Sequence, residues 1–93
     1  MIVGVVKVVI HAPWVHSLKE KRMEVKSLCA KVRNTFNVSI AEVDLNDVHQ
    51  QIALGFASVV NESNVADSMI DNVLNFIESN TEGEIIDVCR ELR

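Results

Sequence analysis

The chain has 93 residues, of which 48% are hydrophobic and 24% are charged, and its formal net charge is −4. This length predicts a single domain over residues 1–93, and the apolar content supplies a core and excludes a disordered chain. Two cysteines are too few for the disulfide framework of a small secreted domain, so we expect reduced thiols. The apolar opening segment is short and contains Lys7, which argues against a membrane span or signal peptide and predicts a cytoplasmic protein.

The first predicted element is a strand over Met1–His11, which consists almost entirely of valine and isoleucine. Their branched side chains are stiff and favour extended backbone. A run this apolar is typical of a central strand buried on both faces. The charge of Lys7 predicts that its parity points to the more exposed face. The residues expected to share that face are Val3, Val5, Val9 and His11.

A loop over residues 11–16 contains the only tryptophan, and it follows because Pro13 has no N–H to give to a strand ladder. Ser17 and Glu20 then form a capping box, which marks the start of a helix. We predict this helix from Leu18 to Thr35. Its apolar face is expected to consist of Leu18, Val25, Leu28, Cys29, Val32 and Phe36.

Two strands separated by a turn are predicted next. Val38–Val43 is the expected second strand, and Asp44–Asp47 has the turn chemistry of Asp and Asn side chains. Val48–Val60 is the expected third strand. Gly55 lies inside it, and a glycine there indicates a bulge or a close approach, for which a helix packed on the sheet is the ordinary explanation.

A second helix and a final strand complete the predicted chain. Asn61 or Ser63 is expected to cap the helix, and Asn80 with Gly83 to end it. Glu84–Leu92 is the expected last strand. The predicted apolar stripe of the second helix consists of Val65, Met69, Val73, Phe76 and Ile77.

The resulting order is βαββαβ, which predicts an α+β, ferredoxin-like sandwich. Two helices then cover one face of a four-stranded antiparallel sheet, and the other face stays open. The first strand is apolar at both parities, so an uncovered patch is expected, and such patches mark interaction surfaces. We expect a homodimer through the sheet or a strand edge, with a partner protein or RNA as the alternative occupant.

Charge is distributed unevenly along the chain. Residues 1–40 carry seven Lys and Arg against two Asp and Glu, whereas residues 41–93 carry two against eleven. At about 100° per residue, four cations of the first helix fall within roughly 60° of one another. This basic ridge consists of Lys19, Arg22, Lys26 and Arg33. Such a ridge can bind phosphates, and the alternative interpretation is a solvated helix face.

Trp14 lies between two histidines in the loop before the first helix. An exposed tryptophan can stack on a base or anchor an interface, and it can equally fold back over the core as a lid. The helix start after Ser17 adds backbone donors and a partial positive charge. We therefore expect Trp14, His16, Lys19 and Arg22 near one end of the molecule, as the local candidate for a binding site.

Residues with catalytic or metal-binding chemistry do not form a recognised motif. His11, His16 and His49 lack the spacing of a zinc site. Cys29 falls on the apolar helix face and Cys89 on the last strand, with no evident orienting partner. No phosphate-binding glycine loop or nucleophile elbow occurs. We therefore expect no metal, no cofactor, no small-molecule substrate and no enzymatic activity.

The chain as a whole resembles the YlxP-like family of small bacterial proteins, whose domain has no assigned function. The matching segments are Met1–Val8, Ser17–Arg22, Phe36–Asp44 and the pair Leu54-Gly55. The resemblance implies a ferredoxin-like fold and a bacterial cytosolic origin. Genes of this family often lie beside those for translation initiation and ribosome-binding factors, which implies a role near the ribosome or RNA.

Together these features predict a non-enzymatic accessory factor that binds rRNA or a ribosomal particle. The basic ridge would neutralise phosphates, and Trp14 in its loop would stack on a base. The alternative is a protein-interaction or homodimerisation module that uses the open sheet face without nucleic acid.

Overall fold

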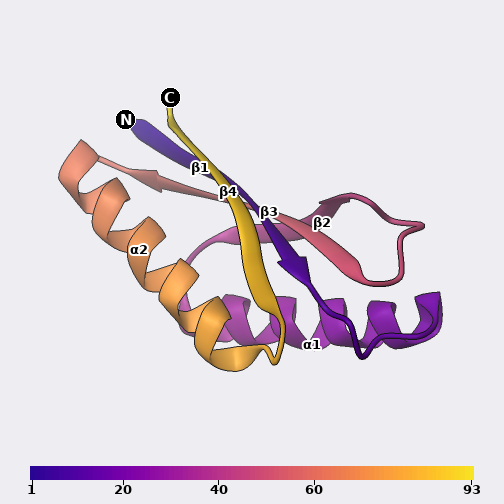
Figure 1. The fold of residues 1–93 in the computed structure, drawn as a ribbon. Helices are drawn as coiled ribbons and strands as arrows, with labels where there is room; N and C mark the ends of the chain where they lie inside the picture. Colours follow the sequence, from indigo (N-terminus) through magenta and orange to yellow (C-terminus); the bar gives the residue numbers. More distant parts are fainter.

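The computed structural model describes residues 1–93 as one four-stranded antiparallel sheet with two helices. In chain order the elements are β1 (Ile2–His11), α1 (Leu18–Thr35), β2 (Ser39–Asp44), β3 (Gln51–Val60), α2 (Ser63–Asn80) and β4 (Glu84–Leu92). The sheet order is β2-β3-β1-β4. Both helices cover the same face (Figure 1). The predicted ferredoxin-like βαββαβ arrangement is confirmed.

The core lies between the sheet and the helices, and the alternation along β1 defines it. Val6, Val8 and Ile10 are at most 1% exposed and face the helices. In β3 they pair with Phe56, Leu54 and Ile52, which are also buried. The helices close the core with Leu28, Cys29, Val32, Ile70, Val73 and Ile77.

The opposite parity of the strands forms a second face that no helix covers, which we call the open face. Lys7 lies on it as predicted, because β1 alternates between buried and more exposed residues. Its Nζ pairs with Asp44 Oδ2 at 2.8 Å. This hydrogen bond lowers the pKa of the Asp44 carboxyl. The apolar residues that β1, β2 and β3 contribute to the open face are Val3, Val5, Val9, Ala41, Val43, Ala53, Ala57 and Val59.

The glycine of β3 has a different neighbour from the predicted one. A Cβ at Gly55 would come within 2.8 Å of Val43 Cγ1, which lies on the open face rather than on a helix. The register of β2 against β3 shifts between Glu42 and Asp44. The bulge turns Val43 over the glycine, so sheet geometry and not helix packing explains the small residue.

Three further expectations need correction, two at element boundaries and one in the apolar stripe of α2. β3 begins at Gln51 rather than Val48, because Val48 donates its N–H to Leu45 O in a turn. The N-cap of α2 is Glu62, and its side chain makes no capping hydrogen bond. Val65 is 41% exposed and lies outside the buried stripe, where Ala66 is found instead.

Candidate nucleic-acid interface

The loop before α1 is built by the predicted capping box. Ser17 Oγ accepts a hydrogen bond from the N–H of Glu20 at 3.1 Å. The Glu20 carboxylate accepts the N–H of His16 at 3.4 Å, one residue before the N-cap Ser17, to which the reciprocal bond of a standard capping box would go. These contacts satisfy backbone donors at the helix start and fix the approach of the loop.

Lys21 is buried in the first helix, only 1% exposed, and sequence reasoning placed it outside every candidate site. Its Nζ donates to the carbonyl oxygens of Leu45 and Val48, the latter at 2.7 Å. It also lies 3.0 Å from Glu42 Oε2. That oxygen accepts no aligned hydrogen bond, so the contact with Glu42 is chiefly one between charges.

One signal for Lys21 was present in the sequence. At about 100° per residue it falls between Leu28 and Val32, within about 20° of each, and so lies on the apolar face. A cation on that stripe needs a partner, because an unpaired buried charge is costly. The partners come from β2 and the loop after it, more than twenty residues further along the chain.

The β1–α1 and β2–β3 loops lie at the same end of the molecule (Figure 1). The N–H of Ala12 donates to Gln50 O at 2.8 Å, and Gln50 Nε2 donates to Pro13 O at 2.9 Å. Between the two loops lies a surface depression of ≈ 510 Å³, which we call the loop hollow. It is lined by Val15, His16, Asp47, Val48, His49 and Gln50. Sequence reasoning named His16 but did not bring His49 to it.

Trp14 is half-buried and packs against the hydrophobic core. This position agrees with the lid interpretation. His16, in contrast, is exposed and faces the loop hollow. The side chain next to the ridge that is free for a ligand is therefore the histidine.

The basic ridge is divided by its contacts. Lys19, Arg22 and Lys26 are exposed and make no ion pair or side-chain hydrogen bond. Arg33, at the other end of the helix, donates from Nη2 to Ile40 O at 2.8 Å and so ties α1 to β2. The free part of the ridge thus occupies the N-terminal half of α1, which begins beside the loop hollow.

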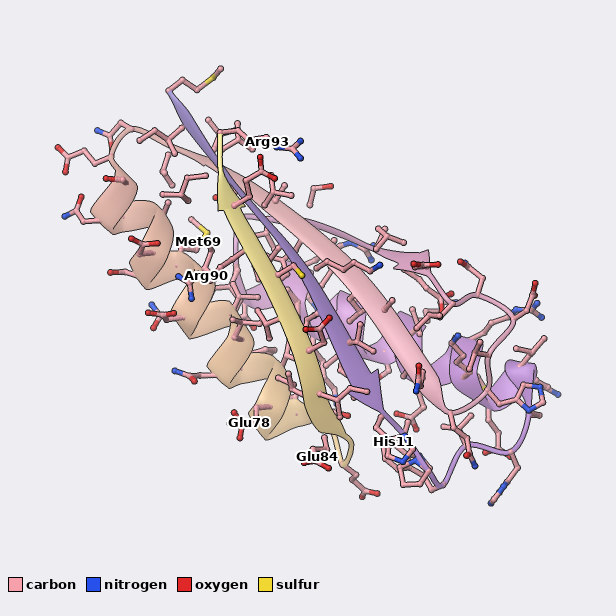
Figure 2. All side chains as sticks on the ribbon, turned by 45° about the horizontal axis from the view of Figure 1, so that its top comes forward. His11, Met69, Glu78, Glu84, Arg90 and Arg93 are labelled. Atoms are coloured by element: carbon pink, nitrogen blue, oxygen red, sulfur yellow. The ribbon has the colours of Figure 1, made fainter.

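The remaining cations of the chain are also engaged, apart from Lys31. Lys7, Lys21 and Arg33 have the partners described above, and two arginines remain. Arg90, on β4, binds Asp71 at 2.7 Å and Asp67 at 3.3 Å on α2, and Figure 2 shows its side chain directed toward that helix. Arg93 binds Glu91 at 3.1 Å. The four unpaired cations among nine therefore all lie on α1.

The two cysteines differ in burial, and neither forms a disulfide. Cys29 is buried and burial raises the pKa of its thiol, whereas Cys89 is exposed and both are free. No three His, Cys, Asp or Glu side chains come close enough to hold a metal ion. His11 of β1 and Glu84 of β4 lie opposite each other in the strand register, at one end of the sheet (Figure 2). Neither helix is long and apolar enough to cross a membrane.

Comparisons with known proteins agree with the fold and extend to nearly the whole chain. The family model described as "Protein of unknown function (DUF503)" matches residues 3–90. "Uncharacterized protein YlxP" of Bacillus subtilis (strain 168) is 40% identical over 68 residues, which cover 73% of this chain and 74% of that protein. This relative confirms the YlxP-like resemblance.

Two solved structures are similar in fold alone. The structural-genomics protein YJCS superposes with a TM-score of 0.59 at 13% identity and covers 96% of both chains. A designed protein with a ferredoxin fold, LFR1 1, superposes with a TM-score of 0.58 at 16% identity, over 100% of this chain and 85% of that one. At these identities the likeness carries no information on function.

Proposed function

Because the chain belongs to the DUF503 family, whose description assigns no function, we propose from its own surface that it binds the phosphate backbone of RNA. The observation that carries the proposal is that all four unpaired cations lie on α1, while the other five Lys and Arg are held by partners within the fold. According to this proposal, the protein is a non-enzymatic accessory factor whose partner is rRNA or a ribosomal particle.

The position of the acidic residues on α1 supports a phosphate-binding surface. Glu20 and Glu24 project at least about 100° around the helix from each of Lys19, Arg22 and Lys26. The three cations rise over about 10 Å along the axis, which spans about three backbone steps of a nucleic-acid strand. A phosphate strand lying along this flank therefore meets three cations without meeting the carboxylates of the same helix.

The chain's net charge of −4 limits the strength of such binding. Neutralising about three phosphates of a single strand predicts a log–log salt slope of about −2. Affinity is therefore expected to fall by roughly twentyfold between about 50 and 200 mM salt. Binding of this kind is sensitive to sequence only where other contacts read the bases.

The test is the salt dependence of binding to a labelled single-stranded oligoribonucleotide and to purified ribosomal subunits. The variant K19Q/R22Q/K26Q removes the free ridge cations, and we expect it to lose binding and flatten the salt slope. The matched control is Lys31→Gln, which removes an exposed, unpaired cation from the opposite flank of the same helix. Equal loss from both variants, or no loss from the triple variant, would contradict the proposal.

A second candidate function rests on the open face. Val43 and Val59 there are 53% and 65% exposed, and Val3, Val5 and Val9 are only partly covered. Four strands about 4.8 Å apart and about 3.3 Å per residue give a face of about 600 Å². Two such faces together bury about 1,200 Å², the lower bound of a stable interface. A second copy of this chain is thus an occupant of adequate size.

Light scattering on a size-exclusion column tests this candidate. A dimer at tens of micromolar, converted to a monomer by Val59→Lys, is the expected result. The control is Met23→Lys, a change at an exposed apolar residue of α1, which faces away from the sheet. A monomer at every concentration would rule out the homodimer.

A further inference from the structure

We propose that the loop hollow receives an unpaired base of the RNA, so that the ligand is single-stranded and binds with its phosphates on the free ridge cations. The inference rests on the proposed RNA binding and adds the ligand's form and its base site. It starts from a juxtaposition that no motif in the sequence encodes. His16 and His49 come from different loops and line the same hollow.

The walls of the loop hollow are held in place before any ligand binds. Lys21 fixes one loop through the carbonyls of Leu45 and Val48. Gln50 fixes the two loops to each other through Pro13. Burying a lysine so that its ammonium group binds the carbonyls of a surface loop is costly. A turn that is only solvated does not need such a lysine. Preorganised walls lower the entropy cost of binding a ligand there.

Among the aromatic and imidazole rings of this protein, only those of His16 and His49 are exposed, and both line the loop hollow. Phe36 and Phe76 pack edge to face at 5.4 Å, and Phe56 is 3% exposed. Trp14 packs against the core. The open face carries valines and alanines rather than the aromatic side chains on which sheet-type RNA binders stack bases. The exposed imidazoles of the two loops are therefore the platforms for a base.

The charges around the loop hollow favour a base inside it and phosphates outside it. Asp47 lines the hollow, and its carboxylate repels phosphate and accepts hydrogen bonds. A base with an amino group supplies the donor that such a carboxylate prefers, as cytosine does and uracil does not. The phosphates then lie on Lys19 and Arg22, which begin the ridge three and six residues after His16.

The experiment compares binding of labelled oligocytidine, oligouridine and a duplex RNA of equal length at low salt. The variants are H16A/H49A, D47N and K19Q/R22Q/K26Q, with Lys31→Gln as control and circular dichroism to verify folding. We expect the protein to prefer oligocytidine over both other ligands. The double histidine variant should lose at least about fivefold in affinity for oligocytidine, the lower value for one stacked base. D47N should reduce the preference for oligocytidine over oligouridine.

The outcomes separate this inference from the function on which it rests. If the ridge variant loses binding while H16A/H49A binds as the parent does, the hollow is not a base site and phosphate binding stands. Binding of duplex as tight as that of oligocytidine also overturns the inference alone. If no ridge variant changes the affinity, both fail. Weaker binding of the duplex than of oligocytidine, together with the loss of affinity in H16A/H49A, supports the base site.

Discussion

Replacing Lys21 with methionine removes one buried charge and keeps most of the apolar stem. The side chain is 1% exposed, and the Glu42 carboxylate that it faces is 16% exposed. Removing one partner of a buried pair costs about 3–5 kcal/mol, because the other charge stays buried without compensation. The residual solvent contact of Glu42 favours the lower value, so we expect a loss of about 3 kcal/mol in the free energy of unfolding.

This loss is large for a domain of this size. A chain of 93 residues is expected to have a free energy of unfolding of about 5–14 kcal/mol. A loss of about 3 kcal/mol lowers the melting temperature by about 12–24 °C. Urea unfolding followed by circular dichroism measures the loss in free energy of unfolding. An unchanged m-value, the slope of that free energy against urea concentration, is the sign of a two-state change.

Two further variants make the reasoning on Lys21 refutable. Lys31→Met removes an exposed cation of the same helix and should stay within about 0.5 kcal/mol of the parent. The double variant K21M/E42Q removes the uncompensated carboxylate charge, so it should be more stable than Lys21→Met alone. A loss below about 1 kcal/mol in Lys21→Met, or no recovery in the double variant, would show that the buried pair does not stabilise the loop as argued.

Three other expectations follow from the structure. Alkylation followed by mass spectrometry should label exposed Cys89 rapidly and Cys29 only on unfolding, since burial raises the pKa of the Cys29 thiol; equal rates would contradict its burial. The lowered pKa of Asp44 means that its pair with Lys7 stabilises the fold at neutral pH and is lost as pH falls through that pKa. In an NMR titration, Lys7→Met should raise the titration midpoint of Asp44, because the hydrogen bond and charge of Lys7 that lower its pKa are removed, and an unmoved midpoint would exclude the pair. Gly83→Ala should lower the free energy of unfolding in urea by about 1–3 kcal/mol, because its Cβ would lie 2.7 Å from a β1 carbonyl oxygen. An unchanged free energy of unfolding would show that the backbone shifts to accommodate the methyl group.

Most of the fold was predictable because its signals are local. The capping box at Ser17 and Glu20 predicted α1 with the bounds that the structure has. The parity of β1 predicted which residues face the helices and which face away, since side chains alternate along a strand. The errors were at places where a tertiary contact overrides local preference. Val48 has strand propensity, but its carbonyl is held by Lys21 and the strand begins later.

The candidate site was only half predictable, for the same reason. Helical periodicity alone placed Lys19, Arg22 and Lys26 on one flank, and the structure leaves all three unpaired. It also placed Arg33 with them, but nothing in the spacing indicated that Ile40 O binds this guanidinium. Whether each cation is paired or free depends on which carboxylates and carbonyls the folded chain places beside it.

The amino-acid sequence by itself therefore determined the βαββαβ order, the apolar faces and the positive flank of α1, because each depends on residues a few positions apart. Only the tertiary structure decided that Lys21 is buried, that Trp14 rests on the core and that His16 and His49 share a hollow. These facts join segments more than twenty residues apart. The antiparallel pairing of β2 with β3 sets the distances between these segments, and that pairing exists only in the folded sheet.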